Sequence, residues 1–118
     1  MQSSDRLLVA CLCAAWCGTC REYEAAFEAA RAADGGAADW AWIDIEDHDE
    51  VLGPLDVDNF PTLLIARGDQ VLFYGTVTPH LQTLQRLLAN ARQGDFQPVI
   101  DAQLAGLPAR ARPYLKSE

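Results

Sequence analysis

Hydrophobic and polar residues follow one another in blocks that predict strands and helices in turn. Residues 7–13 form a continuous apolar run, which is typical of a strand buried on both faces of a mainly parallel sheet. Residues 20–34 are rich in Ala, Glu and Arg, and their apolar members recur at the spacing of one helix face, before two glycines that end the helix. Residues 40–45 are a second predicted strand, and residues 47–55 a short helix or turn that Asp47 is expected to cap.

The second half of the chain has the pattern of a hairpin followed by a helix. Residues 62–66 and 71–74 are predicted strands joined by a tight turn. The leucines between Pro79 and Gly94 have helical spacing, with the proline suited to the first turn and the glycine to the end. This order of elements predicts an α/β fold, in which a central mixed sheet of about four strands carries helices on both faces.

The C-terminal end is less regular. Residues 98–107 are predicted to form two or three helical turns, whereas the prolines and short side chains of 108–113 favour an extended segment. We therefore divide the chain into one domain at 1–93 and a C-terminal extension at 94–118, a short helix plus tail.

Charge and length narrow the classes of function. The chain of 118 residues has a formal net charge of −8, so it is expected to repel nucleic acid and anionic membrane surfaces. Its apolar runs are shorter than the roughly 20 residues that a membrane span needs. The polar N-terminal residues do not resemble a signal peptide, and protein partners fit this composition better.

The chemistry of the chain is concentrated in its cysteines. All four of them lie within ten residues, at Cys11, Cys13, Cys17 and Cys20. Cys17 falls where a buried strand gives way to a helix, so free backbone N–H groups and the positive end of the helix dipole favour its thiolate. Cys20 lies one turn further on, partly covered and in reach of Cys17, where it is suited to resolve a mixed disulfide. Between the two cysteines, Gly18 allows close approach of a partner backbone. Beside them, Arg21 either adds a nearby positive charge or points to solvent.

The sequence around these cysteines resembles the thioredoxin family. The resemblance covers residues 7–93 and is carried by a short set of motifs: Ala14-Ala15-Trp16-Cys17-Gly18-Thr19-Cys20, then Phe60-Pro61-Thr62, a hairpin with Gly75, and a last helix. It implies a thioredoxin-like three-layer sandwich that is shortened at its N-terminus. It also implies a cis peptide bond before Pro61 beside the active sulfurs, and backbone hydrogen bonds from Phe60 to the substrate chain. By the same resemblance, Trp16 and Gly75 help to form the apolar surface on which oxidised substrates dock.

Three departures restrict the resemblance. Cys11 stands where the family usually has a buried Asp that assists proton removal from the second active cysteine, and Trp42 stands where a buried Lys often accompanies it. Thr19 occupies a position that is commonly Pro and that tunes the reduction potential. We expect the family's usual first strand and helix to have no counterpart here, and the C-terminal residues to cover what their absence exposes.

Two readings of Cys11 and Cys13 remain open. They share one face of the first strand, where they are either small buried hydrophobes or an accessory disulfide or relay thiol beside the active pair. A zinc site built from all four cysteines is a further alternative, but the spacing makes tetrahedral closure awkward, and we expect no metal. His48 and His80 are expected at the surface rather than as ligands.

We therefore expect a thiol-disulfide oxidoreductase that exchanges disulfides with protein substrates through Cys17 and Cys20. Its redox-active disulfide would serve in place of a cofactor, and reduction is the favoured direction because a reducing, cytoplasmic location is expected. A thioredoxin reductase is one candidate electron donor. The alternative function is a redox-gated or non-catalytic module that holds a protein partner on the same apolar surface.

Overall fold

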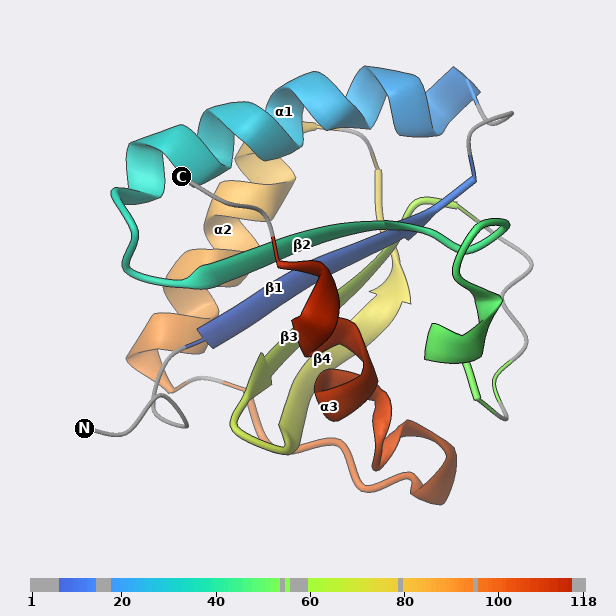
Figure 1. Ribbon diagram of the computed structural model, residues 1–118. Helices are drawn as coiled ribbons and strands as arrows, with labels where there is room; N and C mark the ends of the chain where they lie inside the picture. The colour runs from blue at the N-terminus through green and yellow to red at the C-terminus, as the bar shows by residue number, and fades with distance from the viewer. Residues whose placement is uncertain are drawn as a thin grey trace.

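A mixed four-stranded sheet forms the centre of the protein. The computed structural model describes residues 7–14, 18–53, 55, 60–78, 80–94 and 96–115. The strands are β1 (Leu7–Cys13), β2 (Asp39–Asp44), β3 (Thr62–Arg67) and β4 (Gln70–Thr76), in the spatial order β2-β1-β3-β4. The β1 and β2 strands are parallel, and the other two pairings are antiparallel. The predicted α/β architecture is confirmed, including the hairpin of β3 and β4 (Figure 1).

Helices cover both faces of this sheet. On one face lie α1 (Gly18–Asp34) and α2 (Leu81–Gln93), and on the other lies α3 (Leu107–Ala111) (Figure 1). Because β1 is central, every one of its residues is buried, and alternate side chains enter the two cores. This explains its continuous apolar sequence. Cys11 and Cys13 point into the core between the sheet and the helices α1 and α2, which we call the α1-side core.

A carboxylate joins the two long helices to the sheet. Asp34, the last residue of α1, accepts hydrogen bonds from the backbone N–H of Ala38 at 2.7 Å and from Nε1 of Trp40 at 3.1 Å. It also forms an ion pair with Arg92 of α2. Its side chain is only 2% exposed, whereas that of Arg92 is 42% exposed, so a buried carboxylate is paired with a guanidinium at the surface. The carboxylate thereby sets the position of α1 against β2 and α2.

The predicted boundaries need small corrections. The first helix begins at Gly18 rather than residue 20, and β4 extends to Thr76. A short 3₁₀ helix, η2 (Asp49–Val51), lies within 47–55, but the residue that precedes it is His48, so Asp47 is not its cap. Gly94 ends α2 in the left-handed conformation, as predicted. Pro79 lies outside the described residues.

The prediction of an extended segment at 108–113 is wrong. These residues form most of α3 and of the 3₁₀ helix η4 (Arg112–Tyr114), whereas 98–107 contains only the short 3₁₀ helix η3 (Ala102–Leu104) as a complete element. Pro108 is compatible with a helix because it occupies the first turn, where its missing N–H is not needed.

The C-terminal segment covers the second face of the sheet. Leu104, Leu107 and Ala111 are buried in the core that contains Leu8, Ala10 and Leu12 of β1. Leu115 forms an antiparallel bridge with Ala41, at the free edge of β2. The C-terminal residues therefore cover this face of the sheet. None of the helices in the described ranges is long and apolar enough to cross a lipid bilayer.

Candidate functional site

The predicted dithiol lies where β1 ends and α1 begins. Cys13 is the last residue of β1, and Cys20 is the third residue of α1. Trp16 and Cys17 lie between them in the sequence and outside the described residues. The site is therefore built here from Cys20 and the residues around it, and the predicted positions of Trp16 and Cys17 stay predictions.

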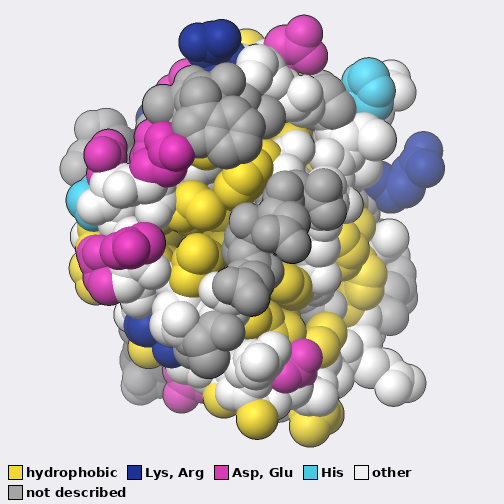
Figure 2. All heavy atoms as spheres, turned by 90° about the vertical axis from the view of Figure 1, so that its right-hand side faces the viewer, with side chains coloured by type: hydrophobic (Ala, Val, Ile, Leu, Met, Phe, Trp, Pro, Cys, Tyr) yellow, Lys and Arg dark blue, Asp and Glu magenta, His cyan; other side chains and the backbone are white. Residues whose placement is uncertain are grey.

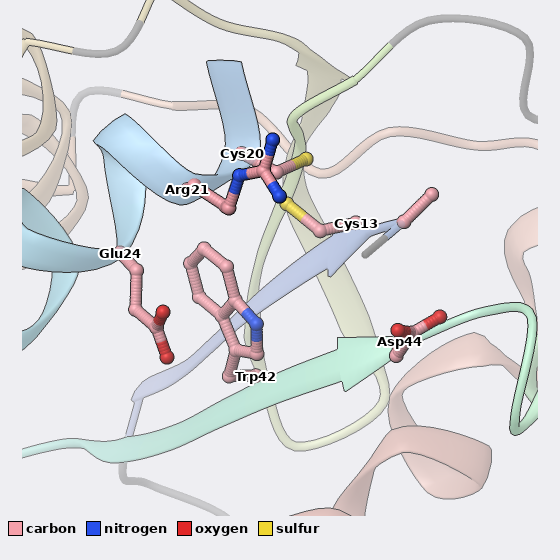
Figure 3. Close-up of a pocket in the computed structure, with 7 residues that line it drawn as sticks. Cys13, Cys20, Arg21, Glu24, Trp42 and Asp44 are labelled. Carbon is pink, nitrogen blue, oxygen red and sulfur yellow. The ribbon is translucent and has the colours of Figure 1, made fainter. Parts of the chain in front are cut away.

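Cys20 lies at the wall of a small pocket. The pocket has a volume of about 210 Å³, and its lining comprises Cys13, Ala14, Cys20, Arg21, Glu24, Trp42 and Asp44. Figure 3 shows the sulfurs of Cys13 and Cys20 on one side of this pocket, with the Arg21 guanidinium beside them. Both cysteines are only 2% exposed, so the pocket is the route by which solvent approaches their sulfurs. A guanidinium at this wall favours negative charge on a neighbouring sulfur.

Cys11 and Cys13 are in direct contact. Their Sγ atoms are 3.3 Å apart in a fully buried setting. A disulfide bond is about 2.05 Å long, so the two residues are thiols in contact rather than a bonded pair. Because residues two apart point to the same side of a strand, the prediction that they share one face is confirmed.

The second predicted motif is at the start of β3. The Phe60–Pro61 peptide bond is cis, as the resemblance implied. Pro61 is buried, its carbonyl accepts a hydrogen bond from Val77 N–H at 3.0 Å, and Phe60 is half-buried against the α1-side core. Gly75 lies opposite Leu63 in the neighbouring strand.

The two predicted residues between the cysteines are accessible. Gly18 is exposed, and a Cβ added there would meet no atom of the described residues within 4 Å. Thr19 is half-buried. The openness at Gly18 leaves room for a partner backbone, in agreement with the reason for which the glycine was singled out.

Trp42 forms one wall of the pocket rather than a fully buried core residue. It is half-buried, and its ring centroid lies 5.2 Å from that of Phe27 and 6.3 Å from that of Tyr23. It pairs with Cys11 across the parallel strands. The residues that replace the family's buried Asp and Lys are therefore neighbours. Trp40, by contrast, is buried, at 4% exposure.

The hydroxyl of Tyr23 is a polar group in the core next to the site. Its hydroxyl is buried and has no hydrogen-bond partner among the residues that the structure describes. Burial raises the pKa of Tyr23 well above its usual value of 10.0, and the nearby Cys11 and Cys13 raise this pKa further. A buried hydroxyl without a partner carries a desolvation cost of about 1–3 kcal/mol.

Replacement of Tyr23 by Phe should therefore stabilise the protein. We expect the free energy of unfolding at pH 7 to rise by about 1 kcal/mol, because the change removes only the unpaired hydroxyl. Above about pH 10 the unfolded chain releases the phenol proton while the folded chain retains it, so wild-type stability falls there and the variant lacks this contribution. Urea unfolding at pH 7 and pH 10.5 measures both effects. A loss of stability at pH 7 would contradict the placement of this hydroxyl.

The remaining candidates are surface features. His80 is exposed, and the His48 side chain is 43% exposed and stacks on Tyr114. In the part of the chain that the structure describes, no group of three or more His, Cys, Asp or Glu side chains is placed to bind a metal ion. The four-cysteine zinc alternative includes Cys17 and so extends beyond the described residues.

The end of the molecule that carries the site combines apolar and acidic surface. Figure 2 shows hydrophobic side chains in the middle of this face and acidic side chains gathered to one side of them. In the segment that follows β2, the exposed acidic residues are Glu46, Asp47, Asp49 and Glu50, the last two of them in η2.

Two pocket residues were missed by the sequence analysis. Glu24 lies four residues after Cys20 on α1, a spacing that places both on one helix face. Asp44 pairs with Cys13 between β2 and β1. The same register pairs Trp42 with Cys11.

Comparisons with known proteins agree with this geometry. The chain is 34% identical over 68 residues to the protein disulfide-isomerase A6 homolog of Caenorhabditis elegans; this match covers 58% of the chain but only 16% of that relative's length. Thioredoxin from Trypanosoma brucei brucei has 26% identity and a TM-score of 0.67, covering 77% of this chain and 79% of its own. The germline-specific thioredoxin Deadhead from Drosophila melanogaster shares the fold, with 24% identity and a TM-score of 0.66. The match covers 75% of this chain and 83% of the Deadhead chain. The thioredoxin family model matches residues 1–90, and the chain therefore belongs to the thioredoxin family.

Proposed function

We propose that the protein is a thiol-disulfide oxidoreductase that reduces disulfides in protein substrates through Cys17 and Cys20. The observation that supports this most directly is the placement of Cys20, which is buried in the first turn of α1 at the wall of a pocket. The membership of the thioredoxin family and the likeness to the disulfide-isomerase homolog agree with this class of reaction.

The reaction proceeds in two exchanges. The Cys17 thiolate attacks one sulfur of the substrate disulfide, and the other substrate sulfur leaves as a thiol. Cys20 then attacks the Cys17 sulfur, which forms the Cys17–Cys20 disulfide and releases the second substrate thiol. The start of α1 at Gly18 puts the free N–H groups of the helix next to Cys17 in the sequence, where they favour the attacking thiolate.

Proton removal from Cys20 takes a different route from the usual one. Cys11 replaces the buried Asp of the family, so no carboxylate is available from that position of β1. The pocket that Cys20 lines contains two carboxylates, Glu24 and Asp44, together with the Arg21 guanidinium. Solvent in this pocket receives the proton, with Glu24 and Asp44 as neighbouring acceptors.

We place substrate binding at the edge formed by the Phe60–Pro61 motif and the cysteine motif. Phe60 and the cis-bonded Pro61 are at the start of β3, and Gly75 is in the adjoining strand. An extended substrate segment would pair with the Phe60 backbone while its disulfide approaches Cys17. The proposed electron donor is a thioredoxin reductase, and the proposed location is the reducing cytoplasm, where the protein would act without a cofactor or metal.

Reduction of insulin tests this function. With dithiothreitol as electron donor, we expect the protein to accelerate cleavage of the insulin disulfides well above the rate of dithiothreitol alone. Ile100→Ala, a change at a side chain that is 92% exposed and far along the chain, should leave this rate unchanged. A wild-type rate equal to the uncatalysed one would contradict the proposal.

A binding module is the second candidate function. It is favoured by one observation, the replacement of the family's buried acid by Cys11, which removes a proton acceptor from the core. Such a module would hold a partner on the same surface with slow exchange. In the insulin assay it would give no acceleration, and it would still retain an insulin chain in a pull-down from which thiol reductants are omitted.

A further inference from the structure

The buried pair Cys11 and Cys13 has no part in the exchange just described. Both thiols lie in the α1-side core, with their sulfurs 3.3 Å apart. Cys13 additionally lines the pocket that Cys20 lines. The contact between Cys11 and Cys13, and the pocket that Cys13 and Cys20 both line, thus lead from the core to the proposed dithiol.

We propose that Cys11 and Cys13 form a second redox centre, which passes an electron pair to the Cys17–Cys20 disulfide through Cys20. This inference rests on the proposed function, because that disulfide is the oxidant. The protein would then carry two disulfide equivalents, and one reduced molecule would reduce two substrate disulfides before it needs its own reductant.

The strand geometry permits a bond between Cys11 and Cys13. Two residues along an extended strand span about 6.6 Å between Cα atoms, inside the range of up to about 6.8 Å found in disulfides. The two side chains already share a face, and their sulfurs need to approach by about 1.2 Å from the observed 3.3 Å. Side-chain rotation alone does not bring two sulfurs on an extended strand to bonding distance. The bond therefore also needs the chain to bend at Cys13, the last residue of β1, where the register with β3 has already ended at Leu12.

The burial of Cys11 and Cys13 determines which disulfide can oxidise them. Cys11 is 0% exposed and Cys13 is 2% exposed, so a protein disulfide in solution does not reach either sulfur. Cys20 shares the pocket wall with Cys13, and Figure 3 shows the two sulfurs directed to the same part of the pocket. The oxidant that Cys13 meets is therefore the protein's own disulfide.

The exchange balances in two steps. The Cys13 thiolate attacks the Cys20 sulfur, so the Cys13–Cys20 bond forms, the Cys17–Cys20 bond breaks, and Cys17 leaves as a thiolate. Cys11 then attacks the Cys13 sulfur, which forms the Cys11–Cys13 bond and releases Cys20. The thiols of Cys11 and Cys13 are oxidised to a disulfide, and the Cys17–Cys20 disulfide is reduced to two thiols. The protons lost by Cys11 and Cys13 are taken up by Cys17 and Cys20.

Disulfide mapping tests the relay. The fully reduced protein, freed of reductant, is reacted with excess insulin, quenched in acid, alkylated under denaturing conditions and mapped by mass spectrometry. We expect two bonds, Cys17–Cys20 and Cys11–Cys13, and twice the yield of reduced insulin that one dithiol gives. Formation of Cys17–Cys20 alone, with Cys11 and Cys13 alkylated, would overturn the relay and leave the proposed function intact. Formation of neither bond would overturn both.

Three variants separate the relay from a structural effect. Cys13→Ala should form only Cys17–Cys20 and halve the insulin yield. Cys20→Ala should hold insulin on Cys17 while Cys11 and Cys13 remain thiols. Val9→Ala removes buried volume from the same face of β1 and keeps all four cysteines, so it should retain the full yield. A halved yield in Val9→Ala would assign the effect to packing and overturn the relay.

Discussion

Replacement of Leu107 by Ala should lower the free energy of unfolding by about 3 kcal/mol. Leu107 is the first residue of α3 and is 0% exposed, within the core on the second face of the sheet. Truncation of a buried leucine removes its contacts and leaves a cavity that the rigid sheet beside it fills only in part. The loss is a large fraction of the 5–15 kcal/mol that stabilises an ordinary domain.

Ile100→Ala is the matched control for this prediction. Ile100 belongs to the same C-terminal segment, but its side chain is 92% exposed, so its truncation should change stability by less than about 0.5 kcal/mol. Urea unfolding of both variants, followed by circular dichroism, gives the comparison. Equal stabilities for the two variants would show that the C-terminal segment does not pack on the sheet.

The second large effect concerns the two active cysteines. Cys17→Ala should abolish acceleration of insulin reduction, and Cys20→Ala should lower turnover by about 100-fold or more. A well-placed intramolecular thiol acts at an effective concentration far above that of any thiol in solution, so loss of the resolving step is severe. The Cys20→Ala variant should in addition accumulate a mixed disulfide with its substrate on Cys17.

Both variants are to be compared at equal folded fraction. Cys20 is buried, so its replacement also removes packing, and unfolding curves show whether the variant is folded under assay conditions. A folded Cys20→Ala protein with wild-type turnover would contradict the resolving role. An alkylated Cys17 in place of a mixed disulfide would contradict the attacking role.

The sheet and the long helices could be predicted because their patterns are strong. The run at residues 7–13 matches β1 at both ends, since a central strand is apolar at every position. The start of α1 was placed two residues late because Gly18 and Thr19 are poor helix formers, and the helix includes them nonetheless.

The C-terminal segment could not be predicted from local pattern. A helix as short as α3 has too few residues to show a period, and the prolines at 108 and 113 favoured an extended chain. Burial of Leu107 and Ala111 against the sheet decides its conformation, and this contact joins residues far apart in the sequence. Tertiary packing here outweighs local preference.

The cysteines of the site could be predicted from the sequence, whereas the pocket around them could not. The alternation of a strand places Cys11 and Cys13 on one face, as the structure confirms. Their contact, and the pocket that Cys13 shares with Cys20, depend on how α1 packs over β1. The strand register places Asp44 beside Cys13, and the pocket shows that both residues line the same site.

Iodoacetamide labelling at pH 7 tests most directly whether Cys17 is the reactive nucleophile. The account predicts that Cys17 in the folded, reduced protein reacts about threefold or more faster than free cysteine, because a thiolate next to a helix N-terminus is favoured. Cys20, which is 2% exposed, should remain unlabelled until the protein is denatured. A Cys17 that reacts no faster than free cysteine would contradict the account.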